Sequence, residues 1–310
     1  MRYAYASSSP AGVYLLEFLR VNSKNINGEF FGVITAPDKP TGRGQAVLEN
    51  SISRAARDLN LRVFKPRNQE EIAEIITKNQ IDLVVTMAFG VLIGKQLLQL
   101  SKYGWVNLHL SLLPKYRGAA PVQYALLNQE TETGISLFKL DEGLDTGPLA
   151  FQEKTQIGDK ENSAELMKRL SELASGSLLK LINNIENQDF SPQIGEPSFA
   201  PKLKKSQGKI EFGQDSRKIH AQYRAFTPWP GSYADFRGKK IIFTSLDISQ
   251  VDLKGLLPGE AVIKGGELLI QTGSGTLVIT KIKPENSKEL RVMDFGNGIR
   301  YQKTEVLKFE

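Results

Sequence analysis

Two polar side chains that can act on a carbonyl group stand two positions apart in the segment NLHLSLLPKYRG, at 107–118. They are Asn107 and His109, and His109 is one of only 2 histidines among 310 residues. Side chains two positions apart on a β-strand project from the same face of the sheet. If the run GWVNLH at 104–109 is a strand, the amide and the imidazole therefore lie side by side at its end.

A second polar cluster, Asp141, Glu142 and Asp145, stands in the glycine-flanked segment KLDEGLDTGP. If the sheet brings this segment beside the strand at 104–109, a carboxylate can orient and stabilise a charged imidazole. An amide, an imidazole and a carboxylate together suit the stabilisation of negative charge on a carbonyl oxygen while an amine loses a proton. The spacing alone also fits a histidine packed in the core and an aspartate that only stabilises the turn in which it lies.

Strand-like and helix-like patterns alternate through the first 150 residues and must position these groups. Apolar strands that alternate with helices predict a parallel, doubly wound sheet, in which ligands bind beyond the carboxyl ends of the strands. Antiparallel strands at 133–140 and 148–157 and a helix at 163–186 extend it. The predicted strands are 2–6, 30–36, 62–65, 81–87 and 104–109, and the predicted helices are 10–22, 51–59, 69–79 and 91–99.

A change of pattern follows the segment SPQIGEPSFAPKLKKSQG, which is rich in Pro, Ser and Gly and is typical of a linker. A helix at 215–226 and several short β runs with Gly-rich turns then predict a small OB-like barrel. The expected organisation is a Rossmann-like α/β catalytic domain at 1–188, a linker at 189–206 and an OB-like β-barrel domain at 207–310. A chain of 310 residues is long enough for two domains.

Composition narrows the chemistry. The chain contains no cysteine, which excludes disulfides and thiolate catalysis, and with 2 histidines it predicts no metal site. The first apolar run is interrupted by Glu17 and Arg20, so we interpret it as a folded element, and no apolar run is long enough to span a membrane. We expect a cytoplasmic protein. The net charge of +6 is concentrated in residues 200–310, which hold 19 Lys and Arg against 12 Asp and Glu, and this predicts a polyanionic partner.

The order of the motifs carries a family resemblance. NLHLSLLPKYRG followed by LDTG resembles the signature of folate-dependent formyltransferases, and TAPDKPTGRG, MAFG and RAFTPWPG extend the similarity over nearly the whole chain. The resemblance is to the members that act on methionyl-tRNA. It implies a Rossmann-like domain that binds 10-formyltetrahydrofolate and an OB-like barrel that helps to hold the initiator tRNA. The expected reaction is transfer of the formyl group to the methionyl α-amine.

Residue by residue, the resemblance implies that Asn107, His109 and Asp145 are catalytic. Asn107 and protonated His109 would donate hydrogen bonds to the developing oxyanion, and Asp145 would stabilise the imidazolium and help to accept the amine proton. The folate-contacting segment would be Ser111, Leu112, Leu113 and Pro114. The candidate tRNA contacts are Lys39 and Arg43 in the GRG loop and, from the basic charge of the second half, Lys202, Lys204, Lys205 and Lys209.

The sequence departs from the family after Arg43, where QAVLENSI replaces a more basic continuation, and this puts the contribution of that loop to tRNA binding in doubt. Two alternatives stay open: a formyltransferase acting on an amino-sugar nucleotide, and an RNA-binding protein that kept the fold without catalysis. The basic second half favours tRNA over the sugar, and the intact catalytic residues argue against the non-catalytic protein. We expect a monomer with no obligate protein partner and no membrane association.

Overall fold

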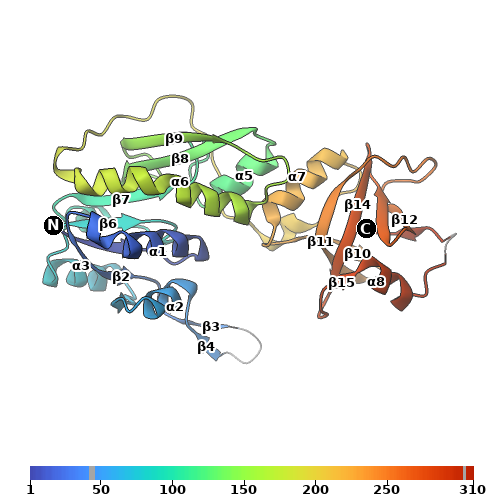
Figure 1. The fold of residues 1–310 in the computed structure, drawn as a ribbon, viewed down its shortest axis with the longest axis horizontal. Helices are drawn as coiled ribbons and strands as arrows, with labels where there is room; N and C mark the ends of the chain where they lie inside the picture. The colour runs from blue at the N-terminus through green and yellow to red at the C-terminus, as the bar shows by residue number, and fades with distance from the viewer. Residues whose placement is uncertain (42–45, 303–304) are drawn as a thin grey trace. The chain divides into compact units, whose positions relative to one another are not determined.

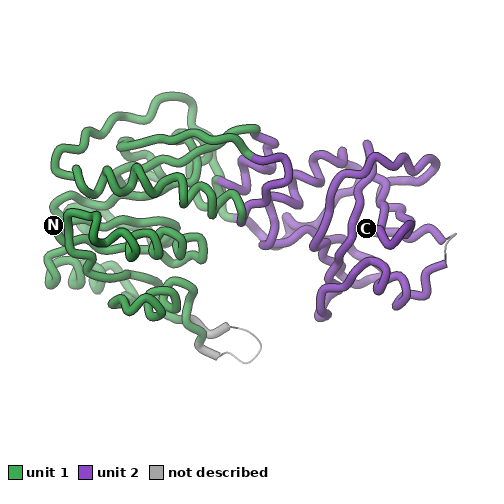
Figure 2. Tube along the Cα trace, viewed as in Figure 1, with its two compact units in different colours: residues 1–121, 131–157, 165–202 green, residues 122–130, 158–164, 203–310 purple. Residues whose placement is uncertain are grey.

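The computed structural model describes residues 1–41, 46–302 and 305–310 and divides the chain into two compact units (Figures 1 and 2). Unit 1 consists of residues 1–121, 131–157 and 165–202, and unit 2 consists of residues 122–130, 158–164 and 203–310. Arg43 lies outside the described residues. Each unit is built around its own sheet.

The sheet of unit 1 confirms the predicted α/β class. Its strand order is β5-β2-β1-β6-β7-β8-β9, with parallel pairing from β5 to β7 and antiparallel pairing of β8 and β9. The order reverses at β1, as in Rossmann-like doubly wound sheets. The strands are β1 (Arg2–Ala6), β2 (Glu29–Ile34), β5 (Val63–Phe64), β6 (Leu83–Thr86), β7 (Gly104–His109), β8 (Glu132–Lys139) and β9 (Leu149–Gln156).

Two helices of this part of the chain, α2 and α3, begin at an asparagine whose side chain caps them. Asn50 accepts a hydrogen bond from the Ser53 N–H, and Asn68 accepts one from the Glu71 N–H, which satisfies free backbone donors of the first turn. The helix expected at 91–99 forms only at 95–98, because Gly94 is still extended (ψ 160). The helices are α1 (Val13–Val21), α2 (Ser51–Asp58), α3 (Gln69–Lys78), α4 (Lys95–Leu98), α5 (Pro121–Leu127) and α6 (Ser163–Asn183).

Strand parity determines which side chains enter which layer of the core. Ala4 and Ala6 of β1 pack with Trp105 of β7 and with Ile72 and Ile76 of α3 on one face of the sheet. Tyr3 and Tyr5, which alternate with those alanines, are fully buried as well, as expected for a sheet covered on both faces. Because both faces are covered, side chains can meet a ligand at the end of the sheet where the parallel strands have their carboxyl ends.

A short hairpin that the sequence analysis did not predict flanks the GRG loop. Its strands are β3 (Lys39–Thr41) and β4 (Ala46–Leu48), which pair antiparallel. The side chain of Lys39 lies outside the described part of the structure.

Unit 2 contains an antiparallel half-barrel, which confirms a smaller barrel-like β domain after the α/β domain. Its strand order is β10-β11-β14-β13-β12-β16, and β15 pairs with β14. The C-terminal segment joins both edges, because Leu307 pairs with Ala261 and Glu310 exchanges backbone hydrogen bonds with Asp235. The elements are α7 (Ser216–Phe226), β10 (Ser232–Phe236), β11 (Lys239–Ser249), β12 (Glu260–Lys264), β13 (Glu267–Gln271), β14 (Thr276–Pro284), β15 (Leu290–Arg291), α8 (Val292–Gly298) and β16 (Leu307–Lys308).

Of the helices in the described ranges, none combines the length and the hydropathy that a membrane crossing requires.

Candidate active site

Asn107 and His109 share one face at the carboxyl end of β7. Asn107 lies between Thr86 of β6 and Phe138 of β8, and His109 is paired with Ser136 of β8. His109 is buried, whereas Asn107 is half-buried. Among the described residues the Asn107 amide has no hydrogen-bond partner, so its N–H groups are available to a ligand.

The His109 ring is oriented by a backbone carbonyl. Its Nε2 lies 2.9 Å from the carbonyl oxygen of Tyr116, and because a carbonyl only accepts, Nε2 must carry a hydrogen. The other ring nitrogen, Nδ1, is 3.7 Å from Oδ2 of Asp145, which is within ion-pair distance but too long for a hydrogen bond. Burial lowers the pKa of His109, while the charge of Asp145 and the bond to Tyr116 oppose that shift. Asp145 is thus the charged group that favours the imidazolium.

Asp145 reaches the histidine because two loops meet. Its backbone is left-handed (φ 52), and its Oδ2 accepts a hydrogen bond of 2.7 Å from the Gly118 N–H, in the loop that follows β7. Gly118 itself has φ 122, and a Cβ at this position would lie 2.7 Å from the carbonyl oxygen of Ala200. Only glycine fits this close approach without strain. The structure therefore brings together the three residues that the sequence proposed, from β7 and from the β8–β9 loop.

The segment Ser111–Pro114 continues directly from β7 and is fixed by two side chains of the neighbouring strands. Ser136 Oγ donates to the Ser111 carbonyl (2.7 Å) and accepts from the Leu113 N–H (3.0 Å). Gln152 Nε2 donates to the Leu113 carbonyl at 2.8 Å. Ser111, Leu113 and Pro114 are buried, so Leu112 is the member of this segment whose side chain is partly exposed.

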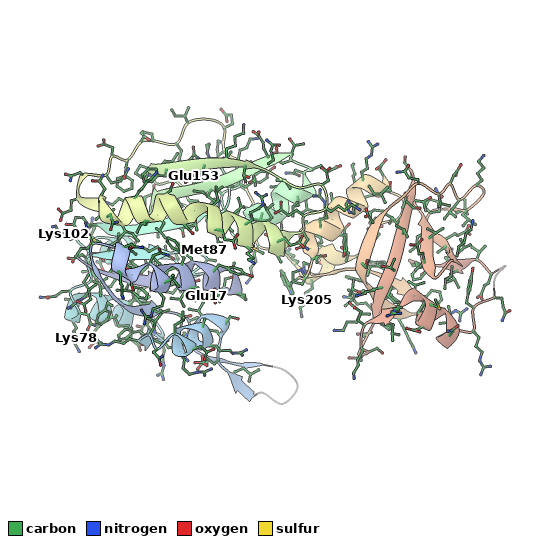
Figure 3. The ribbon with its side chains drawn as sticks, viewed as in Figure 1. Glu17, Lys78, Met87, Lys102, Glu153 and Lys205 are labelled. Carbon is green, nitrogen blue, oxygen red and sulfur yellow. The ribbon has the colours of Figure 1, made fainter. Side chains whose placement is uncertain are left out.

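The proposed tRNA contacts have different surroundings. Lys202, Lys204 and Lys205 are exposed, and Lys205 is labelled in Figure 3. Lys209 forms an ion pair with Asp235 at 3.2 Å, so part of its charge is already compensated. Arg43 and the side chain of Lys39 lie outside the described part of the structure.

One residue that contacts this site, Gln193, was not predicted from the sequence. Gln193 donates to the backbone carbonyls of Asp145 and Gly147 and accepts from Arg117. It lies in the segment predicted to be a linker, and nothing in its local pattern indicates a return to the β8–β9 loop. Ser136 and Gln152 were also missed, because their roles depend on strand pairing.

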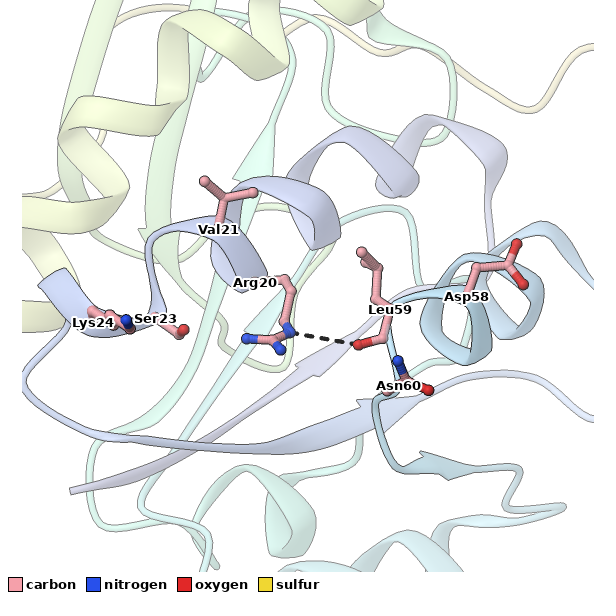
Figure 4. A pocket seen from close by; sticks show the side chains of 7 residues that line it. All are labelled: Arg20, Val21, Ser23, Lys24, Asp58, Leu59 and Asn60. Atoms are coloured by element: carbon pink, nitrogen blue, oxygen red, sulfur yellow. Dashed lines mark hydrogen bonds between the residues drawn. The ribbon is translucent and has the colours of Figure 1, made fainter.

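A cavity of about 420 Å³ lies elsewhere in unit 1 (Figure 4). It is formed at the carboxyl ends of α1 and α2. Because these helices run opposite to the parallel strands, the cavity lies at the amino ends of the strands, whereas Asn107 lies at a carboxyl end. Arg20 Nε is 3.5 Å from the Leu59 carbonyl in its wall. Within the described ranges, no group of three or more His, Asp or Glu side chains is arranged to hold a metal ion.

Comparison with known proteins agrees with this fold. Residues 7–182 match the formyl transferase family, and residues 202–300 match the formyl transferase C-terminal domain. The chain therefore belongs to the folate-dependent formyl transferase family. Within that family it is similar over nearly its whole length to proteins named methionyl-tRNA formyltransferase. It is 36% identical over 301 residues to that of Thermus thermophilus, covering 96% of each chain, and 35% identical over 285 residues to that of Solibacter usitatus, covering 90% of this chain and 91% of the relative.

Solved structures with the same fold include two more distant proteins. HypX from Aquifex aeolicus, in complex with tetrahydrofolic acid, superimposes with a TM-score of 0.70 at 15% identity, over 100% of this chain and 51% of HypX. The chain thus spans about half the length of HypX. WlaRD, a sugar 3N-formyl transferase in the presence of dTDP and 5-N-formyl-THF, gives a TM-score of 0.64 at 22% identity, over 93% of this chain and 99% of that protein. At these identities the likeness shows the fold alone.

Proposed function

We propose that this chain is the enzyme that transfers the formyl group of 10-formyltetrahydrofolate to the α-amine of methionyl initiator tRNA, giving formylmethionyl-tRNA for translation initiation. The observation that carries the chemistry is the Asn107 amide, which has no hydrogen-bond partner among the described residues and lies on the same strand face as His109, whose Nδ1 is 3.7 Å from Asp145. The observation that carries the acceptor is the similarity to methionyl-tRNA formyltransferases through both domains.

The proposed reaction begins with the uncharged methionyl amine. Its nitrogen attacks the formyl carbon, and the carbonyl oxygen takes up negative charge. Asn107 donates an N–H to this oxygen. Because Nε2 of His109 is held by the Tyr116 carbonyl, the imidazolium would donate from Nδ1, next to Asp145. Preorganised donors of this kind are worth about 10²–10³ in turnover each.

Collapse of the tetrahedral intermediate completes the transfer. The new carbon–nitrogen bond to the methionyl amine remains, and the bond between the formyl carbon and N10 of the folate breaks. The attacking nitrogen loses one proton, for which we propose Asp145 as acceptor, directly or through water. N10 gains a proton, so that tetrahydrofolate leaves as the neutral amine. Asp145 can do this only while the Gly118 N–H holds its carboxylate beside the ring.

We propose that the folate lies along the segment Ser111–Pro114. The hydrogen bonds from Ser136 and Gln152 fix the backbone of this segment, which suits a preformed binding wall. Leu112, which is partly exposed, is the side chain that can contact the ligand directly. No metal takes part in this proposal.

For the tRNA, we propose that the catalytic domain at 1–188 and the barrel domain at 207–310 are joined through the predicted linker at 189–206, of which residues 191–200 are hydrogen-bonded within unit 1. Basic residues at the end of this stretch would track the phosphate backbone. The exposed Lys202, Lys204 and Lys205 support this. Lys209 would have to give up its ion pair with Asp235, and the roles of Lys39 and Arg43 remain predictions. The cytoplasmic location, the monomeric state and the lack of an obligate protein partner also remain predictions.

The decisive experiment compares acceptors. Purified protein is incubated with 10-formyltetrahydrofolate and either charged initiator methionyl-tRNA or an amino-sugar nucleotide, and the formylated product is measured. We expect turnover with the tRNA and none with the sugar. Turnover with the sugar alone would show that the chain is a formyltransferase acting on an amino-sugar nucleotide. No turnover with either acceptor would favour a non-catalytic RNA-binding protein.

A second experiment tests the lysines. The double variant Lys204→Ala plus Lys205→Ala should bind tRNA more weakly and lower the slope of log affinity against log salt by about two. The double variant Lys78→Ala plus Lys102→Ala removes the same charge near the amino ends of the parallel strands of unit 1, away from the proposed site, and serves as the control. An unchanged salt slope in the first variant would remove these lysines from the interface.

A further inference from the structure

Residues 191–200, here called the return segment, are hydrogen-bonded to both loops that carry the proposed catalytic groups. At one end, the backbones of Ser191 and Leu149 exchange two hydrogen bonds of 2.8 and 2.9 Å, next to the β8–β9 loop. At the other end, Arg117 N donates to the Ser198 carbonyl and Ala200 N donates to the Arg117 carbonyl, each at 2.8 Å. The whole network lies within unit 1.

Gln193 is the side chain of this segment that contacts the Asp145 loop. Its Nε2 donates to the carbonyl oxygens of Asp145 (2.8 Å) and Gly147 (2.9 Å), and its Oε1 accepts from Nη2 (2.6 Å) and Nε (3.2 Å) of Arg117. The partners fix the orientation of the amide, because carbonyls only accept and a guanidinium only donates. One neutral side chain therefore connects the loop of Asp145 with the loop after β7.

The contact matters because the left-handed backbone conformation of Asp145 needs stabilisation by neighbouring residues. A non-glycine residue at φ 52 is uncommon and persists when its surroundings enforce it. Gln193 holds the peptide oxygens of Asp145 and Gly147, while the Gly118 N–H holds the Asp145 carboxylate. Without Gln193, the loop loses these two backbone contacts, and the single bond from Gly118 is left to hold the carboxylate in place.

The return segment also supports the histidine. Ser198 Oγ accepts a hydrogen bond of 2.9 Å from the Tyr116 N–H, and the carbonyl of Tyr116 is the acceptor for Nε2 of His109. Tyr116 is itself left-handed, with φ 61. The return segment thus bonds Asp145 directly through Gln193 and reaches His109 through one intervening residue, Tyr116.

We propose that Gln193 is a positioning residue that fixes the Asp145 carboxylate relative to His109, and that the return segment is part of the active-site framework. The inference rests on the proposed formyl transfer for its kinetic consequence. Gln193 touches no reacting atom in this scheme, because it acts through the backbone of Asp145 and Gly147.

The kinetic test uses three substitutions. Gln193→Ala removes the contact, and Gln193→Glu keeps the size and the acceptor for Arg117 but cannot donate to the two carbonyl oxygens. Both should lower kcat by about 10- to 100-fold, since small misplacements of a catalytic group have effects of this size, with little change in KM for either substrate. Gln188→Ala, at a half-buried glutamine three residues before Ser191 that donates to the carbonyl oxygen of Asp189, is the matched control and should behave as wild type.

A double-variant cycle separates positioning from general stability. If Gln193 acts through Asp145, Gln193→Ala should cost little once Asp145→Asn is present, so the two losses in kcat should not add. Independent losses that multiply would overturn the inference, as would a kcat for Gln193→Glu within about twofold of wild type.

A readout that needs no activity keeps the inference testable if the proposed reaction fails. The chain has only 2 histidines, so NMR can follow the titration of each ring separately. Asp145 raises the pKa of His109, so displacement of the carboxylate in Gln193→Ala should shift the His109 titration to lower pH, whereas His220 should not move. An unchanged His109 titration in a folded variant would refute the positioning role, whatever the acceptor assays show.

Discussion

Replacement of Asp145 by Asn is the sharpest test of the proposed chemistry, because it removes one charge and leaves the shape. The Asn side chain can still accept the hydrogen bond that the Gly118 N–H donates at 2.7 Å. What disappears is the negative charge 3.7 Å from Nδ1 of His109, between side chains that are only 5% and 14% exposed. The loop therefore keeps its hydrogen bond to Gly118, while the imidazolium loses its counter-charge.

The size of the effect follows from this distance. Two unit charges at 3.7 Å attract by about 4 kcal/mol at an effective dielectric constant of about 20. Some of this attraction is screened at the partly exposed carboxylate, and each 1.36 kcal/mol corresponds to about tenfold in rate. We therefore expect kcat to fall by about 10²–10³ in Asp145→Asn, with a smaller change in KM.

The pH dependence has a defined sign. Burial already lowers the pKa of His109, and Asp145 opposes that shift, so the substitution lowers this pKa further. A mechanism that needs protonated His109 then loses activity at a lower pH than the wild type does, and the variant should recover part of its relative rate on acidification.

The assay is formylation of charged initiator methionyl-tRNA at saturating 10-formyltetrahydrofolate, measured over a range of pH. Glu142→Gln in the same loop is the matched control, because it removes a carboxylate whose ion pair with Lys95 is well exposed. A kcat for Asp145→Asn within about tenfold of the wild type would refute the role of the charge. So would a pH profile that does not move.

Three other changes have expected outcomes. Asn107→Ala should lower kcat by about 10²–10³ and leave the melting temperature nearly unchanged, because the amide has no hydrogen-bond partner in the described chain that would be left unsatisfied. Gly118→Ala should destabilise the protein by about 1–3 kcal/mol in urea unfolding and lower kcat as well, because its Cβ would lie 2.7 Å from the Ala200 carbonyl at φ 122. Burial lowers the folded-state pKa of both His109 and His220, so the unfolded chain binds protons first and the free energy of unfolding should decrease as the pH falls below about 6.5. His220→Gln should make this decrease shallower, measured by urea unfolding at neutral and mildly acidic pH.

Each of these can be contradicted. Asn107→Ala with near-normal turnover would show that the amide is not an oxyanion donor. Gly118→Ala with unchanged stability would show that the approach of Ala200 is not tight. An equal acid sensitivity of the wild type and His220→Gln would mean that this histidine titrates at its ordinary pKa in the folded protein.

Local patterns predicted the elements and the faces of their side chains. The alternation of apolar strands with helices indicated the doubly wound sheet, since each periodicity reports which side chains are buried on one element. The strand at 104–109 was predicted with the bounds that β7 has, and parity placed Asn107 and His109 together. Short or weakly patterned elements were less predictable: β5 covers only Val63–Phe64, and the hairpin of β3 and β4 was missed.

The family motifs singled out Asp145 from the acidic cluster at 141–145, but only the tertiary structure placed it beside His109. Its approach depends on the left-handed backbone of Asp145, on the Gly118 N–H and on Gln193, which is 48 residues further along the chain. Such contacts join loops whose positions are decided by the packing of several strands, and no periodicity within one segment contains that information. The lowered pKa of His109 has the same origin, because burial is a property of everything that surrounds the ring. The sequence alone thus determined which residues could do the chemistry and which strand carries two of them, whereas the folded chain decided that the third one reaches them and what holds it there.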